Sequence, residues 1–477
     1  MKEKEQKNIG ITAKKAEDFS EWYAQAIIKS ELVDYTSVSG CFAFRPYGYA
    51  IWEKIVAETD RRLKKLGVKN VYFPLFIPEK LLQKEAAHVA GFTPEVAWVT
   101  EAGNTKLDER LAVRPTSETI MYDSYSKWIR SWRDLPIKYN QWNNVVRWEF
   151  KHPTPLIRTR EFLWCEGHSA FATREEAEKE IEEMLSLWKE VTENLLAVKG
   201  VSGKKSEEEK FAGAIASYSI EFLLPNGKTA QGPDAHFDGQ NFAKAFEISF
   251  LDKEGKKEYA WQNTWAITTR MIGIMAMIHG DDRGLILPPN IAPVQAVIVP
   301  ITFDKDKEAV IKEANKLKQQ LKHLSVELDL RDEYTPGWKF NDWEMKGVPV
   351  RIEIGPKDIA KEQAVLVRRD TGKKEFVKIA GIKAAVDAAL EDIQQQLLKK
   401  SEEFLKGNIA EAASVAEIKK AADSRKMATA YFCGSQKCEE QIKATEAKSL
   451  CISREGKKGK CIICSKESYL GYFGKSY

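Results

Sequence analysis

Two strand-like segments joined by a polar loop constrain the fold of this chain more than any other feature. Residues 144–150 and 160–167 are rich in Val, Trp, Phe and Leu, and the loop between them carries Arg158. Two short strands with a short connection form an antiparallel hairpin. On a strand, Arg147 and Glu149 project from one face because they are two positions apart. The segment therefore predicts an antiparallel sheet with a charged pair on one face.

The hydrophobic pattern around this hairpin predicts an α+β organisation. Hairpins interleaved with packed helices indicate an antiparallel sheet rather than a doubly wound parallel one. Before residue 288 the expected helices are 16–30, 47–66, 174–196 and 265–278, and the expected strands are 70–77, 111–114, 144–150, 160–167, 220–224 and 243–251. Beyond a boundary at 288–293, strands and helices alternate, which predicts a small α/β domain. Its expected strands are 295–301, 326–330, 348–355 and 364–369, and its expected helices are 306–324 and 382–405.

Length and composition exclude several classes of protein. A chain of 477 residues exceeds what one hydrophobic core supports, so several domains are expected. The longest apolar stretches, 271–278 and 291–301, fall far short of the ~20 residues that a membrane helix needs, and no membrane partner is expected. The net charge of +4 permits a polyanionic partner without requiring one.

The cysteines gather near the C-terminal end of the sequence, where five of the seven lie after residue 432. Cys433 with Cys438, and Cys461 with Cys464, form two closely spaced pairs, and Cys451 is left over. Four soft thiolates in this arrangement suit tetrahedral Zn²⁺ in a closed structural site. This usage indicates a cytoplasmic protein with one local metal site rather than a secreted disulfide scaffold.

The charged groups in apolar surroundings are candidate ligands for an anion. Arg270 lies in the expected apolar helix 265–278, where an unpaired guanidinium is costly to bury. It therefore faces either an anionic ligand or an internal glutamate. Arg147 can bind phosphate or carboxylate in fork geometry, and Glu149 can accept a hydrogen bond from an amine. The alternative for this second pair is a structural ion pair on a hairpin.

These segments, in this order, resemble the three signature motifs of class II aminoacyl-tRNA synthetases. Residues 47–78 resemble motif 1, which builds the dimer interface in that family, 147–162 resemble motif 2, and 270–283 resemble motif 3. The resemblance implies that Arg147 and Arg270 are catalytic and act with Mg²⁺ on the phosphates of ATP. It implies ATP binding by Arg147, Glu149, Arg158, Phe162, Gln231, Thr268 and Arg270.

Further segments resemble the prolyl-tRNA synthetases in particular. Thr116 and Glu118 match that family's Thr-x-Glu loop, which holds the secondary ammonium of proline. The proline-binding residues implied by the resemblance are Thr116, Glu118, Arg147, Trp164, Glu166, His168 and His236. Relatives commonly carry Gln where this chain has Cys165, and Gly-Thr-Ser-His at 233–236, where this chain has Pro-Asp-Ala-His. The second difference puts Asp234 near the expected ribose and phosphates.

The C-terminal third extends the same resemblance. Residues 293–397 resemble the anticodon-binding domain of this synthetase subgroup, which implies that Glu344, Arg351 and Lys373 contact the anticodon; solvated surface charge is the alternative. A zinc-bearing tail ending in tyrosine is typical of archaeal/eukaryotic-type prolyl enzymes, and Tyr477 matches it. Only 104 positions separate Glu166 from Arg270, too few for the inserted editing domain of bacterial-type relatives.

The resemblance implies a class II catalytic domain at 1–290, an anticodon-binding α/β domain at 291–400 and a zinc-binding α+β domain at 401–477. It implies a homodimeric proline–tRNA ligase that uses ATP, L-proline and tRNA(Pro). One rival is a synthetase for threonine or another small amino acid. The other is a non-catalytic paralogue that uses the fold as a binding module, which would have no need for the complete phosphate-binding set of Arg147, Glu149 and Arg270.

Overall fold

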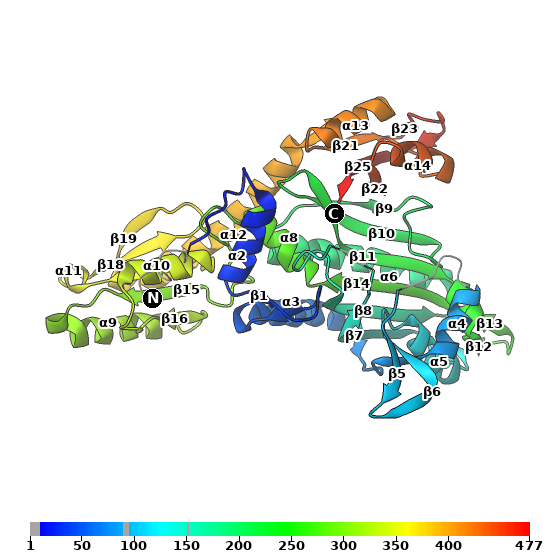
Figure 1. The fold of residues 1–477 in the computed structure, drawn as a ribbon, viewed down its shortest axis with the longest axis horizontal. Coiled ribbons are helices and arrows are strands. Elements are labelled where there is room, and N and C mark those ends of the chain that lie inside the picture. Colours follow the sequence, from blue (N-terminus) through cyan, green and yellow to red (C-terminus); the bar gives the residue numbers. More distant parts are fainter. Residues whose placement is uncertain (1–9, 89–94, 150–151) are drawn as a thin grey trace.

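The computed structural model describes residues 10–88, 95–149 and 152–477. Figure 1 shows a large sheet with helices against it, a smaller sheet at the opposite end of the molecule, and the long helix α12 (Ile382–Gly407) between the two. Within the described residues, no helix is long and apolar enough to cross a membrane.

The large sheet carries the part of the fold that positions the candidate site. Its strand order is β20-β21-β25-β22-β9-β10-β11-β14-β8-β7-β3 across the described residues. The strands nearest the site pair antiparallel throughout. They are β7 (Ile137–Val146), β8 (Glu161–Phe171), β9 (Val201–Lys204), β10 (Ala216–Leu223), β11 (Lys228–Gly239) and β14 (Trp261–Thr268), with β3 (Lys69–Asn70) pairing parallel to β7 at the edge.

Alternation along these strands separates a packed face from a polar face. On the packed face, Cys165, Phe237 and Trp265 join the main hydrophobic core. Helix α6 (Arg174–Glu190) covers this face and buries Ile181 and Trp188 against it. The same core takes in α2 (Phe19–Lys29), α3 (Pro46–Lys65) and α8 (Arg270–His279). The opposite face is left to the polar side chains that form the site.

A second core lies beside the polar face. It buries Tyr122 and Tyr125 of α5 (Glu118–Trp128) against Phe242 and Phe246 of α7 (Asn241–Phe246). The small elements around it are α4 (Glu79–His88) and strands β4 (Phe76–Pro78), β5 (Trp98–Ala102), β6 (Thr105–Val113), β12 (Ser249–Leu251) and β13 (Lys257–Tyr259). Strands β1 (Val33–Tyr35) and β2 (Phe42–Phe44) form a separate hairpin before α3.

The smaller sheet is the expected α/β domain. Its order is β16-β15-β17-β18-β19, with bounds β15 (Ala296–Pro300), β16 (Val326–Leu328), β17 (Val350–Ile354), β18 (Gln363–Arg368) and β19 (Lys374–Lys378). Helices α9 (Lys307–Gln320) and α12 bury one face, while α10 (Pro336–Met345) covers the other through Phe340. The short α11 (Pro356–Ile359) links β17 to β18.

Four of the C-terminal strands extend the large sheet, while β23 (Gly459–Lys460) and β24 (Glu467–Ser468) pair in a small hairpin of their own. The four are β20 (Ile409–Glu411), β21 (Met427–Tyr431), β22 (Lys448–Ile452) and β25 (Leu470–Ser476), with helices α13 (Val415–Asp423) and α14 (Gln436–Lys443) packed against them. The last residues of β25 pair parallel with the start of β11, where Ser476 lies opposite Thr229. The C-terminal residue therefore lies beside the sheet that carries the site (Figure 1).

The α+β class is confirmed, and four local predictions are wrong. Strand 144–150 ends at Val146, so Arg147 and Glu149 are not on a strand and do not share a strand face; Phe150 lies outside the described residues. Residues 265–268 belong to β14, and the helix starts at Arg270. Residues 243–246 form α7 instead of a strand, and 70–77 is divided between β3 and β4.

Candidate active site

Three adjoining cavities on the polar face of the large sheet bring most of the predicted site residues together. The first, of about 250 Å³, is lined by Thr116, Glu118, Trp164, His168 and His236 among others. The second, of about 120 Å³, shares Arg147, Trp164 and Gln231 with the first and adds Phe162, Thr268 and Arg270. The third, of about 230 Å³, shares Gln231 and Arg270 with the second and adds Arg158 and Tyr477.

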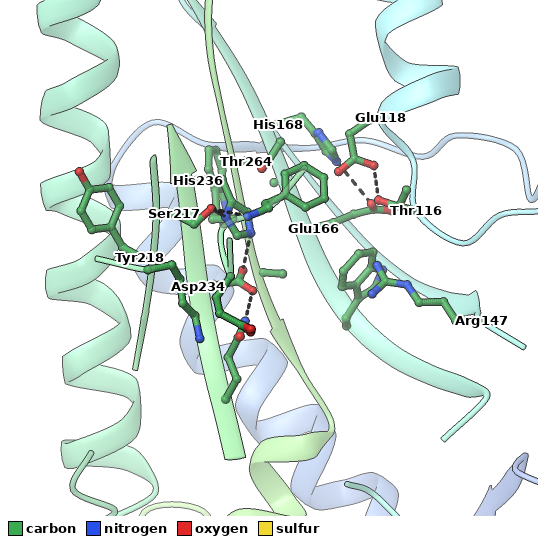
Figure 2. Close-up of a pocket in the computed structure, with 18 residues that line it drawn as sticks. Thr116, Glu118, Arg147, Glu166, His168, Ser217, Tyr218, Asp234, His236 and Thr264 are labelled. Atoms are coloured by element: carbon green, nitrogen blue, oxygen red, sulfur yellow. Dashed lines mark hydrogen bonds and ion pairs between the residues drawn. The ribbon is translucent and has the colours of Figure 1, made fainter. Parts of the chain in front are cut away.

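Two residues at the start of α5 give the first cavity an acidic wall. Glu118 is the first residue of that helix and is 4% exposed. The Thr116 hydroxyl donates a hydrogen bond to Oε2 of Glu118 and holds the carboxylate in place (Figure 2). A buried carboxylate on a cavity wall is suited to receive a cationic amine.

Glu166 is buried in a dense set of hydrogen bonds behind this wall. Its carboxylate accepts from the backbone N–H of Ser117 at 3.0 Å and from Nδ2 of Asn143 at 2.6 Å. Burial would raise its pKa, but hydrogen bonds from His168, Ser117 and Asn143 outweigh that effect and lower the pKa. Glu166 is therefore an ionised carboxylate, and its hydrogen bonds hold the start of α5 and the neighbouring side chains in place.

The opposite wall of the first cavity is formed by His236 on β11. Its Nδ1 lies 2.8 Å from the Ser217 hydroxyl and its Nε2 lies 3.6 Å from Oδ1 of Asp234 (Figure 2). Its ring stacks on Phe211 with 4.9 Å between ring centroids. The space has an acidic wall at Glu118 and aromatic sides at His236 and Trp164, and further charged side chains also line it.

Arg147 lies where the first and second cavities meet. Its Nε donates to the carbonyl of Pro115 at 3.0 Å, which ties the residue after β7 to the loop before α5. The guanidinium lies 5.4 Å from the Trp164 ring centroid and 5.6 Å from that of Phe162. Among the residues that the structure describes, no carboxylate forms a salt bridge with Arg147.

Arg270 is the first residue of α8 and points into the second cavity. Its Nε donates to the carbonyl of Ile157 at 3.0 Å and its Nη1 to that of Gln231 at 3.1 Å. Burial lowers its pKa, and the nearby charge of Arg147 adds to that effect. The alternative, an internal salt bridge between Arg270 and a glutamate, is not found within the described ranges. Asp234 lines the same cavity and its charge partly offsets that of Arg270, but it forms no ion pair with either arginine in the described part of the chain. Such a site is built for a polyanion.

Of two further residues predicted to bind the nucleotide, one lines a cavity and the other does not. Arg158 lines the third cavity. Glu149 lies in an exposed turn after β7, outside the linings of these three cavities. Lys205 and Phe211 also line the first cavity and were not predicted from the sequence. No local motif surrounds them, because only the fold brings their loop to the site.

The four predicted metal ligands, Cys433, Cys438, Cys461 and Cys464, come together in one cluster. Their sulfur atoms all lie within 4.8 Å of one another. The Sγ atom of Cys433 is 3.6 Å from that of Cys438 and 3.5 Å from that of Cys464. Tetrahedral Zn²⁺ with Zn–S bonds of about 2.3 Å needs sulfurs about 3.8 Å apart, so the cluster fits zinc. Cys461 is the fourth member of the cluster. Cys451 is buried outside it.

The three predicted anticodon residues lie on different elements of the α/β domain. Arg351 on β17 donates to Oε1 of Glu353 at 2.9 Å and lies 4.3 Å from the Phe340 ring centroid. Glu344, one helical turn after Phe340, forms a 2.7 Å salt bridge with Arg283. Lys373 lies exposed in the turn between β18 and β19.

Comparison with known families divides the chain into three matches. Residues 98–279 match the tRNA synthetase class II core domain of the G, H, P, S and T group. Residues 295–389 match the anticodon-binding domain, and 415–477 match the C-terminal domain of prolyl-tRNA synthetase.

Whole-chain comparisons agree with these domain matches. The chain is 52% identical over 453 residues to a proline–tRNA ligase of Natranaerobius thermophilus, covering 94% of each sequence. It is also similar to a Cryptosporidium parvum prolyl-tRNA synthetase solved with L-proline and AMP. The two are 44% identical with a TM-score of 0.94 over 99% of this chain and 98% of that one. A structure of the C. parvum enzyme with halofuginone and AMPPNP gives the same identity and TM-score over 98% of this chain and 100% of that one.

Proposed function

The chain belongs to the prolyl-tRNA synthetase family, and on that premise we propose how its residues divide the work of activating proline and charging tRNA. Its activity is that of a proline–tRNA ligase, which activates L-proline with ATP and transfers it to the 3′ end of tRNA(Pro). The observation that carries the residue assignments is the pair of cations, Arg147 and Arg270, beside the acid-walled cavity of Glu118.

Proline would occupy the first cavity. Glu118, held by Thr116, would bind the secondary ammonium, and the stacked His236 and the Trp164 ring would enclose the apolar ring. Glu166 and His168 also line this cavity and would fix its wall through hydrogen bonds, because both are almost fully buried. The proline carboxylate would then point to Arg147 where the two cavities meet.

ATP would occupy the second and third cavities. Arg147 would bind the α-phosphate together with the proline carboxylate, and Arg270 would bind the γ-phosphate. Phe162 would stack on adenine, while Gln231, Thr268 and Arg158 line the path of the ribose and phosphates. Glu149 follows Arg147 by two positions in the chain and would reach the adenine amino group from its exposed turn. Mg²⁺ would accompany the nucleotide.

Activation in this arrangement is a matter of orientation and charge neutralisation. A proline carboxylate oxygen attacks the α-phosphorus, and the bond from that phosphorus to the pyrophosphate oxygen breaks. Two fixed guanidinium groups stabilise the charge that develops on phosphorus and on the leaving pyrophosphate. A terminal tRNA hydroxyl then attacks the prolyl carbonyl, the bond from that carbonyl carbon to the phosphate oxygen breaks, and the hydroxyl proton leaves with AMP. The carboxylate is already ionised, so the first step needs no general base.

We propose that the enzyme is of the archaeal/eukaryotic type and lacks an inserted editing domain. The residues between β8 and α8 form α6, a short π-helix at Val191–Leu195, β9, β10, β11, α7, β12, β13 and β14 and the loops between them. These elements either belong to the large sheet or pack into the two cores beside it. This arrangement leaves no segment long enough to fold as an independent hydrolytic domain.

A homodimer built on the motif 1 segment is the second structural proposal. Tyr35 is 61% exposed, Tyr49 44% and Tyr72 74%, and they lie on or next to the β1–β2 hairpin, α3 and β3. Exposed aromatic side chains in this number are typical of a protein interface. Burial against a second copy would remove them from water.

The remaining assignments concern the C-terminal third. Glu344, Arg351 and Lys373 would contact the anticodon, in a domain spanning 291–400 after a catalytic domain at 1–290. In a third domain at 401–477, Cys433, Cys438, Cys461 and Cys464 would hold a structural Zn²⁺. All seven cysteines are unpaired thiols, which supports a cytoplasmic location.

Exchange of pyrophosphate into ATP, measured with each of the twenty amino acids, tests this function. We expect proline to support exchange and threonine not to. Arg147→Ala should lower proline-dependent exchange by about 10²- to 10³-fold while the dimer persists. Threonine-selective exchange would overturn the assignment of the first cavity. If none of the twenty amino acids supported exchange, the result would favour a non-catalytic binding module.

A further inference from the structure

Helix α8 connects the proposed phosphate site to the anticodon-binding part of the chain. Its first residue, Arg270, lies in the second cavity, and its last residue, His279, is followed by Gly280 and Asp281. Ten helical residues span about 15 Å, and because a helix this short is rigid, a shift of one end also shifts the other. What fixes the C-terminal end of α8 therefore helps to fix Arg270.

That end is held by Asp281 and by groups from distant parts of the chain. Oδ1 of Asp281 accepts from Nη2 of Arg369 at 2.6 Å and Oδ2 accepts from Nη1 at 2.9 Å, a bidentate pair. The Asp281 carbonyl accepts from Nε1 of Trp22 at 2.8 Å, and the Gly280 carbonyl accepts from Nζ of Lys15 at 2.5 Å. A carboxylate beside a helix C-terminus is repelled by the helix dipole, so it needs this positive charge.

Arg369 is built for this contact and also holds the element next to it. Its side chain is 2% exposed, and it lies just after β18 in the anticodon-binding part. Its Nε donates to the carbonyl of Glu344 at 2.8 Å, at the end of α10. Backbone bonds run alongside, from the N–H of Leu285 to the carbonyl of Met345 at 3.0 Å. One guanidinium thus joins the end of α8 to the helix that carries a proposed anticodon residue.

We propose that Arg369 is a positioning residue for proline activation: through Asp281 it sets the position of α8 and so of the Arg270 guanidinium at the phosphates. The inference rests on the proposed role of Arg270. It makes the adenylation step depend on the docking of the anticodon-binding part, although no residue of that part lines the first or second cavity.

The test compares two neighbouring arginines. Arg369→Gln removes the pair with Asp281. Arg368→Gln is the matched control, because Arg368 forms its salt bridges to Asp370 at 2.9 Å and Asp392 at 2.5 Å within the anticodon-binding part itself. Proline-dependent exchange is measured for both, at varied proline and ATP, with thermal unfolding as the folding check.

We expect Arg369→Gln to lower kcat about 3- to 30-fold with the KM for proline unchanged, and Arg368→Gln to stay within about twofold of the wild type. Asp281→Asn should give the same loss, and the double variant no further loss, because the two residues act as one pair. If Arg369→Gln does not fold, the kcat of Asp281→Asn in proline-dependent exchange tests the inference. A wild-type kcat in Asp281→Asn or in folded Arg369→Gln, or an equal loss in Arg368→Gln, overturns the inference while leaving the proposed function intact. A wild-type chain without proline-dependent exchange overturns both.

Discussion

Replacing Arg270 by lysine separates the charge of this residue from its geometry. The guanidinium has five N–H donors, of which Nε and one N–H of Nη1 are used by the carbonyls of Ile157 and Gln231. Three donors remain to face a phosphate. A lysine ammonium keeps the charge but cannot hold both carbonyls and a phosphate in the same geometry.

The expected loss follows from the bonds removed. One charge-assisted hydrogen bond to a phosphate is worth about 1.5–3 kcal/mol, which corresponds to a decrease in kcat of about 10- to 100-fold for Arg270→Lys. Arg270→Met also removes the charge and should cost about 10²- to 10³-fold. The KM for proline should not change in either variant, because Arg270 does not line the first cavity.

Pyrophosphate exchange at saturating proline and ATP measures these effects, with thermal unfolding as the control for folding. We expect the exchange rate to fall from the wild type to Arg270→Lys and further to Arg270→Met. An Arg270→Lys variant within twofold of the wild type would show that only charge matters. A rise in the KM for proline equal to the loss in kcat would place Arg270 in the wrong cavity.

Three further predictions concern other parts of the chain. Purified protein should contain one zinc per chain, and Cys461→Ser should lower that content while Cys451→Ser, outside the cluster, should not; metal analysis decides, and equal losses would contradict the four-cysteine site. Arg351→Ala should weaken tRNA charging far more than proline activation, and equal losses in the two assays would make Arg351 structural. Burial lowers the pKa of His279 from 6.5 to about 4, so the folded chain binds its proton less readily than the unfolded chain. The stability that depends on neutral His279 is complete above pH 6.5 and is lost as the pH falls toward 4, by at most about 3 kcal/mol of unfolding free energy. In denaturant titrations, the unfolding free energy of His279→Gln should therefore fall less steeply than that of the wild type between pH 6.5 and 4. An equal pH dependence in the two proteins would contradict the prediction.

Long periodic segments and local clusters could be predicted from the sequence. Helix α3 differs from the expected 47–66 by one residue at each end, because Ile51, Trp52 and Ile55 mark one buried face. The four cysteines were recognisable because metal ligands keep short spacings within each pair. The α/β alternation after residue 293 predicted four of the five strands of the smaller sheet, and β19 was not predicted.

Boundaries decided by tertiary contacts could not be read in this way. The apolar residues of 265–268 fit a helix as well as a buried strand, and only pairing with β8 and β11 makes them β14. Strand β7 ends at Val146, although the N–H of Arg147 still donates to the carbonyl of Arg160 at 2.7 Å, and the following residues turn away from the sheet. Lys205, Phe211 and Arg369 carry no local signal, since each acquires its partners from segments far away in the chain.

A crystal structure of the chain with a non-hydrolysable prolyl-adenylate analogue tests the central assignment most directly. We expect the phosphate-mimicking group within hydrogen-bond distance of the Arg147 guanidinium and the prolyl nitrogen at the Glu118 carboxylate. An analogue bound with its nitrogen turned away from Glu118, or with no contact to Arg147, would contradict the account.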